Sequence, residues 1–384
     1  MGSLRYSSKQ GLFGVLFFVA LWLIAVPVKA ADKVKVVATF SVLGDLVKEV
    51  GQDHVQVKTL VGADGDAHVY QPSPRDAGAV AKADLVVLNG LGFEGWIERL
   101  LEASHYKGEQ VVATTGIKVL KSGEAGHHDE KHDGHEAHHG DDHHDDHDKK
   151  HHDDHASHHD EHDGHKEHDH DDHHDEKHHD EHDEKHHGGH DSHKEHAGAD
   201  HHGHHHGEWD PHAWHSINNA VIYVRNIAVG LGKADPVHKA DYQRNAEAYI
   251  AKLHELEHEI EHLFEDIPEA KRKVITPHDA FGYFAHAYHI DFIAPQGNST
   301  ESEAAAGDVA QIIRQIRAEN IKAVFIENVS DSRLMEQISR ETGAAIGGAL
   351  YSDALSGANG PAGTYLKMMR HNAHTLADAL GHKD

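Results

Sequence analysis

A chain of 384 residues is long enough for two domains of ordinary size. Its formal net charge is −29 with histidine neutral, which argues against a nucleic acid as partner, because phosphate binding needs clustered Lys and Arg. The chain has no Cys, which excludes a thiolate metal site, so any transition-metal site must use imidazole and carboxylate groups.

Residues 1–30 have the pattern of a secretory signal peptide. Positive charge near the start precedes an apolar run over residues 11–28, and Val28-Lys29-Ala30 fits a small-x-small cleavage site. The run approaches the length of a membrane span, so a retained anchor is the alternative. We expect cleavage and secretion of the mature chain, with no Cys near residue 30 to accept a bacterial lipid anchor.

Between residues 33 and 116, apolar strand-like runs alternate with helical patterns. This alternation predicts a parallel sheet covered by helices on both faces. Ser41 is the expected N-cap of the first helix, and Ser73-Pro74 has the composition of a helix start. The expected strands are 35–40, 54–61, 84–89 and 110–114, and the expected helices are 41–50, 73–83 and 94–103.

Residues 126–207 consist of His, Asp, Glu, Lys and Gly with a few Ala and Ser, and they hold most of the 48 histidines. This His-rich tract has no apolar periodicity, so it buries too little apolar surface to offset the entropy of ordering, and we expect a disordered loop. One interpretation is a solvated polyampholyte without a role. The other is a set of many weak imidazole sites that raises the local metal concentration and loses its metal in acid.

Folded sequence is expected to resume at Trp209. A helix is predicted over residues 217–231, and Asp235-Pro236 is the expected start of a longer one that continues to Glu265. At 1.5 Å per residue this helix is about 45 Å long, enough to bridge two lobes. Its apolar residues recur at helical spacing: Tyr242, Ala246, Tyr249, Leu253, Leu256, Ile260 and Leu263.

The same alternation returns in the last third of the chain. Strands are expected at 273–276, 291–294, 322–327 and 344–350, and helices at 280–288, 304–318, 332–341 and 361–380. The predicted fold class is therefore α/β, with two (β/α) lobes built on parallel sheets. The expected division is an N-terminal lobe over 31–234 that contains the tract, a linking helix over 235–268, and a C-terminal lobe over 269–384.

Three histidines and one aspartate stand apart by their context. His68 lies between an expected strand and helix, His212 lies in Asp-Pro-His-Ala-Trp, and His278 and Asp353 each directly follow a strand of the second lobe. Open α/β sheets place their sites at the carboxyl ends of the strands, so these residues predict a metal site in the cleft between the lobes. Taken singly, each His also fits a solvated turn or a helix cap, and Asp353 fits the cap of a short turn.

Four segments together resemble the metal-binding solute-binding proteins of ABC importers for zinc and manganese. The segments follow the family's order, and the resemblance covers nearly all of the mature chain outside the tract. They are Asp66–Pro74, Asp210–Trp214, His278–Phe284 and Tyr351–Ser356. The resemblance implies two (β/α) lobes joined by one long rigid helix, and it implies four metal ligands: His68, His212, His278 and Asp353.

The resemblance also implies a function: a monomeric periplasmic carrier that delivers Zn²⁺ to an inner-membrane ABC permease. Three imidazoles and one carboxylate suit tetrahedral zinc, whereas manganese prefers more oxygen. Manganese members commonly carry Glu where this chain has His278, and a His-rich insertion is typical of zinc members. Some zinc members place Glu directly before the first His; Ala67 stands there in this chain, which favours Asp353 as the fourth ligand.

Three other functions remain open: a manganese-binding member of the same family, a periplasmic zinc buffer or chaperone without a permease, and a zinc hydrolase. The hydrolase rests on His254-Glu255-Leu256-Glu257-His258, which matches the His-Glu-x-x-His pattern, and on its repeat ending at His262. These histidines fall opposite the apolar stripe, so we expect them to be solvated. We expect no enzyme, because a fourth protein ligand leaves no position for an activated water. The other histidines are expected on the surface or in the core: His54, His105, His286, His289, His371 and His374.

Overall fold

The computed structural model describes residues 2–3, 32–123 and 207–382. The expected signal peptide and nearly all of the His-rich tract lie outside the described residues. In the described ranges, no helix combines the length and the apolar character that crossing a membrane requires.

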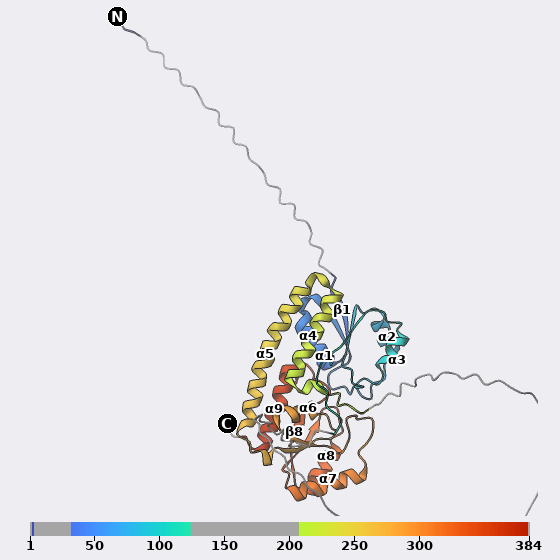
Figure 1. The fold of residues 1–384 in the computed structure, drawn as a ribbon, viewed down its shortest axis with the longest axis vertical. Coiled ribbons are helices and arrows are strands. Elements are labelled where there is room, and N and C mark those ends of the chain that lie inside the picture. The colour runs from blue at the N-terminus through green and yellow to red at the C-terminus, as the bar shows by residue number, and fades with distance from the viewer. Residues whose placement is uncertain (1, 4–31, 124–206, 383–384) are drawn as a thin grey trace, which may run out of the picture. The chain divides into compact units, whose positions relative to one another are not determined.

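Four parallel strands form the sheet of the N-terminal lobe, in the order β2-β1-β3-β4. The two central strands are almost wholly buried, because helices lie on both sides of the sheet (Figure 1). The predicted alternation is confirmed. The elements are β1 (Val34–Phe40), α1 (Ser41–Gly51), the 3-10 turn η1 (Gln52–His54), β2 (Val55–Val61), α2 (Pro74–Val80), β3 (Leu85–Leu88), α3 (Ile97–Ala103) and β4 (Glu109–Val112).

A helical hairpin follows the tract and reaches the second lobe. It consists of the 3-10 turn η2 (Ala213–His215), α4 (Ile217–Ala234), the 3-10 turn η3 (Pro236–His238) and α5 (Lys239–Glu265). Helix α5 packs against α1 and α4 of the first lobe and against α9 (Tyr365–Leu380) of the second (Figure 1). Every residue of the predicted apolar stripe on α5 is buried, which is why one helix can join both lobes.

The sheet of the C-terminal lobe has the strand order β6-β5-β7-β8, again with parallel pairing throughout. Helix α9 starts at Tyr365, four residues later than predicted, because the Thr364 side chain accepts a hydrogen bond from the Lys367 amide and caps it there. The remaining elements are η4 (Glu269–Lys271), β5 (Lys273–Ile275), α6 (Gly282–Tyr288), β6 (Asp291–Ile293), α7 (Ala306–Glu319), β7 (Ala323–Glu327), α8 (Arg333–Thr342) and β8 (Ala345–Leu350).

The prediction that Ser41 caps α1 is wrong. Helix α1 begins at Ser41 without a side-chain cap, and the Ser41 hydroxyl instead accepts a hydrogen bond of 2.9 Å from the backbone amide of Leu355. Leu355 lies in the other lobe, beyond β8. The Ser41 hydroxyl therefore makes a contact between the lobes and does not cap the helix. Ser73, by contrast, forms a reciprocal capping box with Asp76 at the start of α2.

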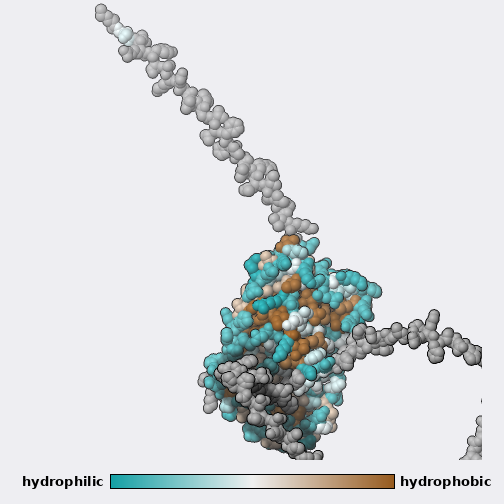
Figure 2. Space-filling view, viewed as in Figure 1, coloured by the Kyte–Doolittle hydropathy of each residue, from teal (hydrophilic) through white to brown (hydrophobic). Residues whose placement is uncertain are grey.

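Polar side chains cover much of the face shown in Figure 2, and apolar residues gather in patches on its upper half. The large apolar side chains that are exposed come from separate elements: Val69, Val112, Val229, Val237 and Ile346. Single exposed apolar residues of this kind are ordinary on protein surfaces, so they identify no binding site.

Asp45 on α1 is a half-buried carboxyl group at the contact between the lobes. Its Oδ2 accepts a hydrogen bond of 2.8 Å from the backbone amide of Tyr365, and burial raises the pKa of Asp45 to about 6. A carboxyl pKa that is higher in the folded state makes the protein less stable as the pH rises from the ordinary value of 3.8 to about 6. We therefore expect Asp45→Asn, which keeps an acceptor for the amide, to stabilise the metal-free protein at neutral pH by about 1–3 kcal/mol.

Urea unfolding measured at two pH values tests this expectation. The stabilisation by Asp45→Asn should be present at neutral pH and should vanish below the ordinary pKa of 3.8, where both folded and unfolded chains hold the proton. A stabilisation of equal size at both pH values would show that the titration of Asp45 is not its cause.

Candidate metal centre

Four loops meet between the lobes and bring the four predicted residues together. His68 lies between β2 and α2, His212 directly precedes η2, His278 follows β5, and Asp353 follows β8. His68 is 8% exposed and the other three are fully buried. One ligand atom from each of the four lies within 4.8 Å of the others. The arrangement can therefore enclose one ion, with two ligands from each lobe.

The distances between these side chains match a ligand shell. Asp353 Oδ2 lies 3.2 Å from His278 Nε2 and 3.3 Å from His68 Nε2. Asp353 Oδ1 lies 3.4 Å from His212 Nε2, and the Nε2 atoms of His212 and His68 are also 3.4 Å apart. Ligands held at about 2.0–2.1 Å around a tetrahedral ion are about 3.3 Å from one another. Each of these four spacings is therefore close to the ligand–ligand distance expected around one small tetrahedral cation.

Several atoms of this group lack the hydrogen bonds that buried polar groups need. Both carboxylate oxygens of Asp353 and the Nε2 of His278 are buried and make no hydrogen bond of good geometry among the described residues, although they lie close to one another and to the other ligands. Burying a charged or polar group without compensation is strongly unfavourable, and such groups in proteins pair or coordinate metals. A divalent cation would satisfy all three atoms at once.

Carboxylates behind two of the rings orient them toward this centre. The Nδ1 of His212 donates to Asp210 Oδ1 over 2.8 Å, and the same oxygen accepts the backbone amide of His212. The Nδ1 of His278 lies 2.6 Å from Glu327 Oε2. An imidazole that gives its Nδ1 proton to a carboxylate presents Nε2 as the free lone pair. Asp210 and Glu327 thus select the ligand atom on each ring.

The charges of the group are arranged to hold a cation. Burial lowers the pKa of His212 to about 3, which keeps that ring neutral. Burial, reinforced by the nearby charge of Asp353, raises the pKa of Asp210 to about 7. For His278 burial opposes the charge, but Glu327 and Asp353 outweigh it and raise the pKa. For Asp353 burial opposes ionisation, but His278 and His212 outweigh it and lower the pKa. A metal ion thus competes with a proton for the His278 nitrogen.

Glu327 and His215 also belong to this centre, although sequence reasoning gave them no role. Glu327 ends the otherwise apolar strand β7. An acidic residue at the carboxyl end of a parallel strand is the sequence signal that could have predicted its role at the site. His215 is fully buried, its Nε2 lies 3.0 Å from the carbonyl oxygen of Ser352, and burial lowers its pKa to about 3. It holds the loop that carries Asp353, and no local pattern separates it from the other histidines.

A cavity of about 880 Å³ leads from the surface to His68. Ser122 and Gly207, which stand on either side of the His-rich tract, are part of its lining. The backbone amide of Ser122 donates to the carbonyl of Glu208 over 3.1 Å, and Lys121 pairs with Trp209 in an antiparallel bridge. The chain therefore leaves and re-enters the fold at one place, on the rim of the cavity.

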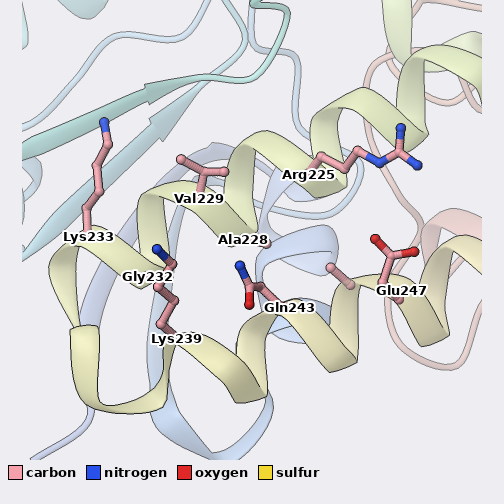
Figure 3. A pocket seen from close by; sticks show the side chains of 9 residues that line it. Arg225, Ala228, Val229, Gly232, Lys233, Lys239, Gln243 and Glu247 are labelled. Carbon is pink, nitrogen blue, oxygen red and sulfur yellow. The ribbon is translucent and has the colours of Figure 1, made fainter.

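A second cavity, of about 450 Å³, lies between α4 and α5 (Figure 3). Basic side chains from both helices border it, among them Arg225, Lys233 and Lys239, and Glu247 is its one carboxylate. It contains no imidazole, so it offers no ligand set for a transition metal.

The His-Glu-x-x-His pattern lies on the outer face of α5, as predicted. His254, His258 and His262 are all exposed. None of them belongs to a cluster of metal-ligating side chains in the described part of the chain. His258 and His262 line a cavity of about 470 Å³ together with His289, but no three ligand atoms of its side chains lie within 4.8 Å of one another. The hydrolase interpretation therefore lacks a metal site in the described part of the chain.

Comparison with known proteins adds three relatives and one family. A family model described as the periplasmic component A of a zinc-uptake complex matches residues 36–379. The iron-binding protein YfeA of Yersinia pestis is 28% identical over 355 residues, which are 92% of this chain and 89% of that protein.

Two further relatives carry the names of other metals. A manganese ABC transporter substrate-binding lipoprotein, scaA of Streptococcus gordonii, is 24% identical over 357 residues, which are 91% of this chain and 90% of that protein. The solved structure of the periplasmic zinc-binding protein TroA from Treponema pallidum has a TM-score of 0.67 at 24% identity and covers 91% of this chain and 99% of its own. That structural likeness confirms the predicted two-lobe α/β fold.

Proposed function

This chain belongs to the family of periplasmic components of zinc-uptake complexes, and from that premise we propose that it captures Zn²⁺ in the periplasm and delivers it to an inner-membrane ABC permease. The family consists of metal-binding substrate-binding proteins of ABC importers and not of enzymes. The names of the relatives mention iron, manganese and zinc, so they do not identify the metal that this chain binds. We infer the metal from the ligands of the site.

The choice of zinc rests on one observation: three imidazoles and a single carboxylate face one point. Zinc takes nitrogen ligands in a tetrahedral shell, while manganese favours oxygen ligands in a larger one. His278 carries this argument, because an acidic residue at that position would give the shell a second carboxylate. We propose His68, His212, His278 and Asp353 as the four ligands, in a monomer that reaches the periplasm through a cleaved signal peptide.

We propose that the His-rich tract collects zinc and passes it to the cavity above His68. Support comes from the place where the tract leaves the fold: its two ends are joined at the cavity rim through the Ser122–Glu208 hydrogen bond. A loop tethered there makes transfer to the cleft intramolecular, so weak sites in the loop raise the effective zinc concentration at the mouth.

Growth of a strain that lacks this gene tests the choice of metal. Under a zinc chelator the deletion should impair growth, and added Zn²⁺ or the intact gene should restore it, whereas a gene carrying His278→Ala should not. Restoration by Mn²⁺ alone would contradict zinc and favour the manganese-binding alternative. A deletion without any effect on metal uptake would favour a periplasmic buffer or chaperone.

Glu327→Gln should weaken zinc binding about 10- to 100-fold, because loss of the carboxylate behind a metal-bound imidazole has effects of this size. Glutamine keeps the shape of the side chain and can still accept the 2.7 Å hydrogen bond from the Ser352 hydroxyl, so the fold should persist. Competition with a chelator of known zinc affinity measures the change, and the melting temperature of the metal-free protein controls for folding. Unchanged affinity would show that Glu327 does not tune His278.

A further inference from the structure

A second group of metal-ligating side chains lies away from the candidate metal centre. His54 ends η1, His238 ends η3, and Asp241 lies in the first turn of α5. One ligand atom from each lies within 4.8 Å of the others, and apart from the candidate centre no other such group occurs among the described residues. Helix α4, with 18 residues, separates the His212 loop from the His238 turn by about 27 Å of helix. The two groups are therefore too far apart to share one ion.

The side chains of this second group already face one another. The rings of His54 and His238 are stacked with centroids 4.0 Å apart. His54 Nε2 lies 3.2 Å from Asp241 Oδ2, and both side chains are 31% exposed. An ion from solvent can therefore reach the group without any opening of the fold.

Asp235 prepares His238 to act as a ligand. The Nδ1 of His238 donates to Asp235 Oδ2 over 2.6 Å, and the Tyr242 hydroxyl donates to the same oxygen over 2.8 Å. The carboxylate thus holds the Nδ1 proton and leaves the lone pair on Nε2, as Asp210 does for His212. This carboxylate–histidine pair is the arrangement that supports metal-bound imidazoles, and it occurs here on a turn with no role in the cleft.

The local charge also favours a cation. Arg244 donates to Asp241 Oδ1 and leaves Oδ2, the atom beside His54, for another partner. The group thus contains two carboxylates, Asp235 and Asp241, and the Arg244 guanidinium pairs with Asp241. Lys239 directly follows His238 in the chain, but it lines the cavity between α4 and α5 (Figure 3).

We propose that His54, His238 and Asp241 form a second, surface site for a divalent transition-metal ion, with Asp235 as the residue that positions His238. Two imidazoles and one carboxylate suit zinc, copper(II) and nickel(II), and water completes the shell. With three protein ligands and a partly exposed position, this site binds more weakly and exchanges faster than the buried centre. Because the ligands come from η1, η3 and α5, a bound ion cross-links η1 of the N-terminal lobe to the start of the helix that joins the lobes. The proposal does not depend on the function of the cleft.

A test on the full chain must distinguish these histidines from those of the tract. Modification of histidine by diethyl pyrocarbonate, read peptide by peptide with mass spectrometry, does so. Zinc is added until the tract peptides are fully protected. We expect His54 and His238 to become protected in the same titration, while His105, an exposed histidine outside both groups, stays reactive. Unchanged modification of His54 and His238 at that zinc concentration would overturn the proposal.

Two substitutions separate metal binding from a general effect of zinc. Asp241→Asn keeps the side-chain shape and removes the anionic ligand, so protection of both histidines should be lost. Asp235→Asn should raise the zinc concentration for half protection about 10-fold or more, since it loosens only the positioning of His238. Glu247 is an exposed carboxylate on the same helix, so Glu247→Gln is the matched control and should leave the protection of both histidines unchanged. Full protection in Asp241→Asn would mean that the three side chains do not share an ion.

Discussion

Tight zinc binding is expected to be lost when His68 and His278 are both replaced by alanine. The double substitution removes one imidazole from each lobe and leaves Asp353 and Glu327 buried without their cationic partner. Since loss of a supporting carboxylate alone weakens metal sites 10- to 100-fold, loss of two ligands should lower the affinity by well over about 100-fold. Metal content after purification and competition with a chelator that strips the tract together measure this loss.

The matched control is His105→Ala with His286→Ala, which removes one exposed histidine from each lobe. It should keep a full equivalent of tightly bound zinc. If the His68→Ala/His278→Ala protein also kept that equivalent, the tight site would lie elsewhere, and the group at His54, His238 and Asp241 would be the next place to look.

Deletion of residues 127–206 should leave one tight zinc site and remove several weak ones. We expect the sites of the tract to be weak and numerous, because its composition is rich in His and poor in apolar residues. The described residues that flank the tract already meet in the Ser122–Glu208 hydrogen bond and the Lys121–Trp209 bridge, so we expect a short turn to close the gap without strain on the cleft. Calorimetry should show the weak phase reduced to what the surface histidines contribute, with the tight phase unchanged.

A tract of equal length made of Ser and Gly provides the control for this deletion. It should reproduce the loss of weak sites, because the imidazoles and not the length of the loop are responsible. Loss of the tight phase in both proteins would contradict the assignment of that phase to the cleft. Loss in the deletion alone would mean that closing the loop distorts the lobes.

Much of the fold follows from local pattern. Apolar runs alternating with helical spacing predicted the strands and helices of both lobes to within a few residues, because burial and backbone hydrogen bonding act locally. The stripe on α5 predicted a helix buried along one side for the same reason. The four residues of the candidate centre were reached differently, through motifs that resemble a family, since each of them alone fits an ordinary turn.

What local pattern missed are contacts between segments distant in the chain. Ser41 is a residue type that often caps helices, yet its hydroxyl accepts a hydrogen bond from the Leu355 amide of the other lobe. In the sequence Glu327 is only the last residue of an expected strand, whereas in the structure its Oε2 lies 2.6 Å from the Nδ1 of His278. His54 and His238 look like unrelated surface residues, and only the packing of η1 against η3 stacks their rings. Tertiary structure decides such pairings, so no window of sequence contains them.

Diffraction data collected on both sides of the zinc absorption edge, from crystals of protein loaded with one equivalent of zinc, test the central claim most directly. We predict a single strong anomalous peak between the lobes, about 2.0–2.2 Å from the Nε2 atoms of His68, His212 and His278 and from the Asp353 carboxylate. A strong peak elsewhere, with these four side chains uncoordinated, would contradict the account.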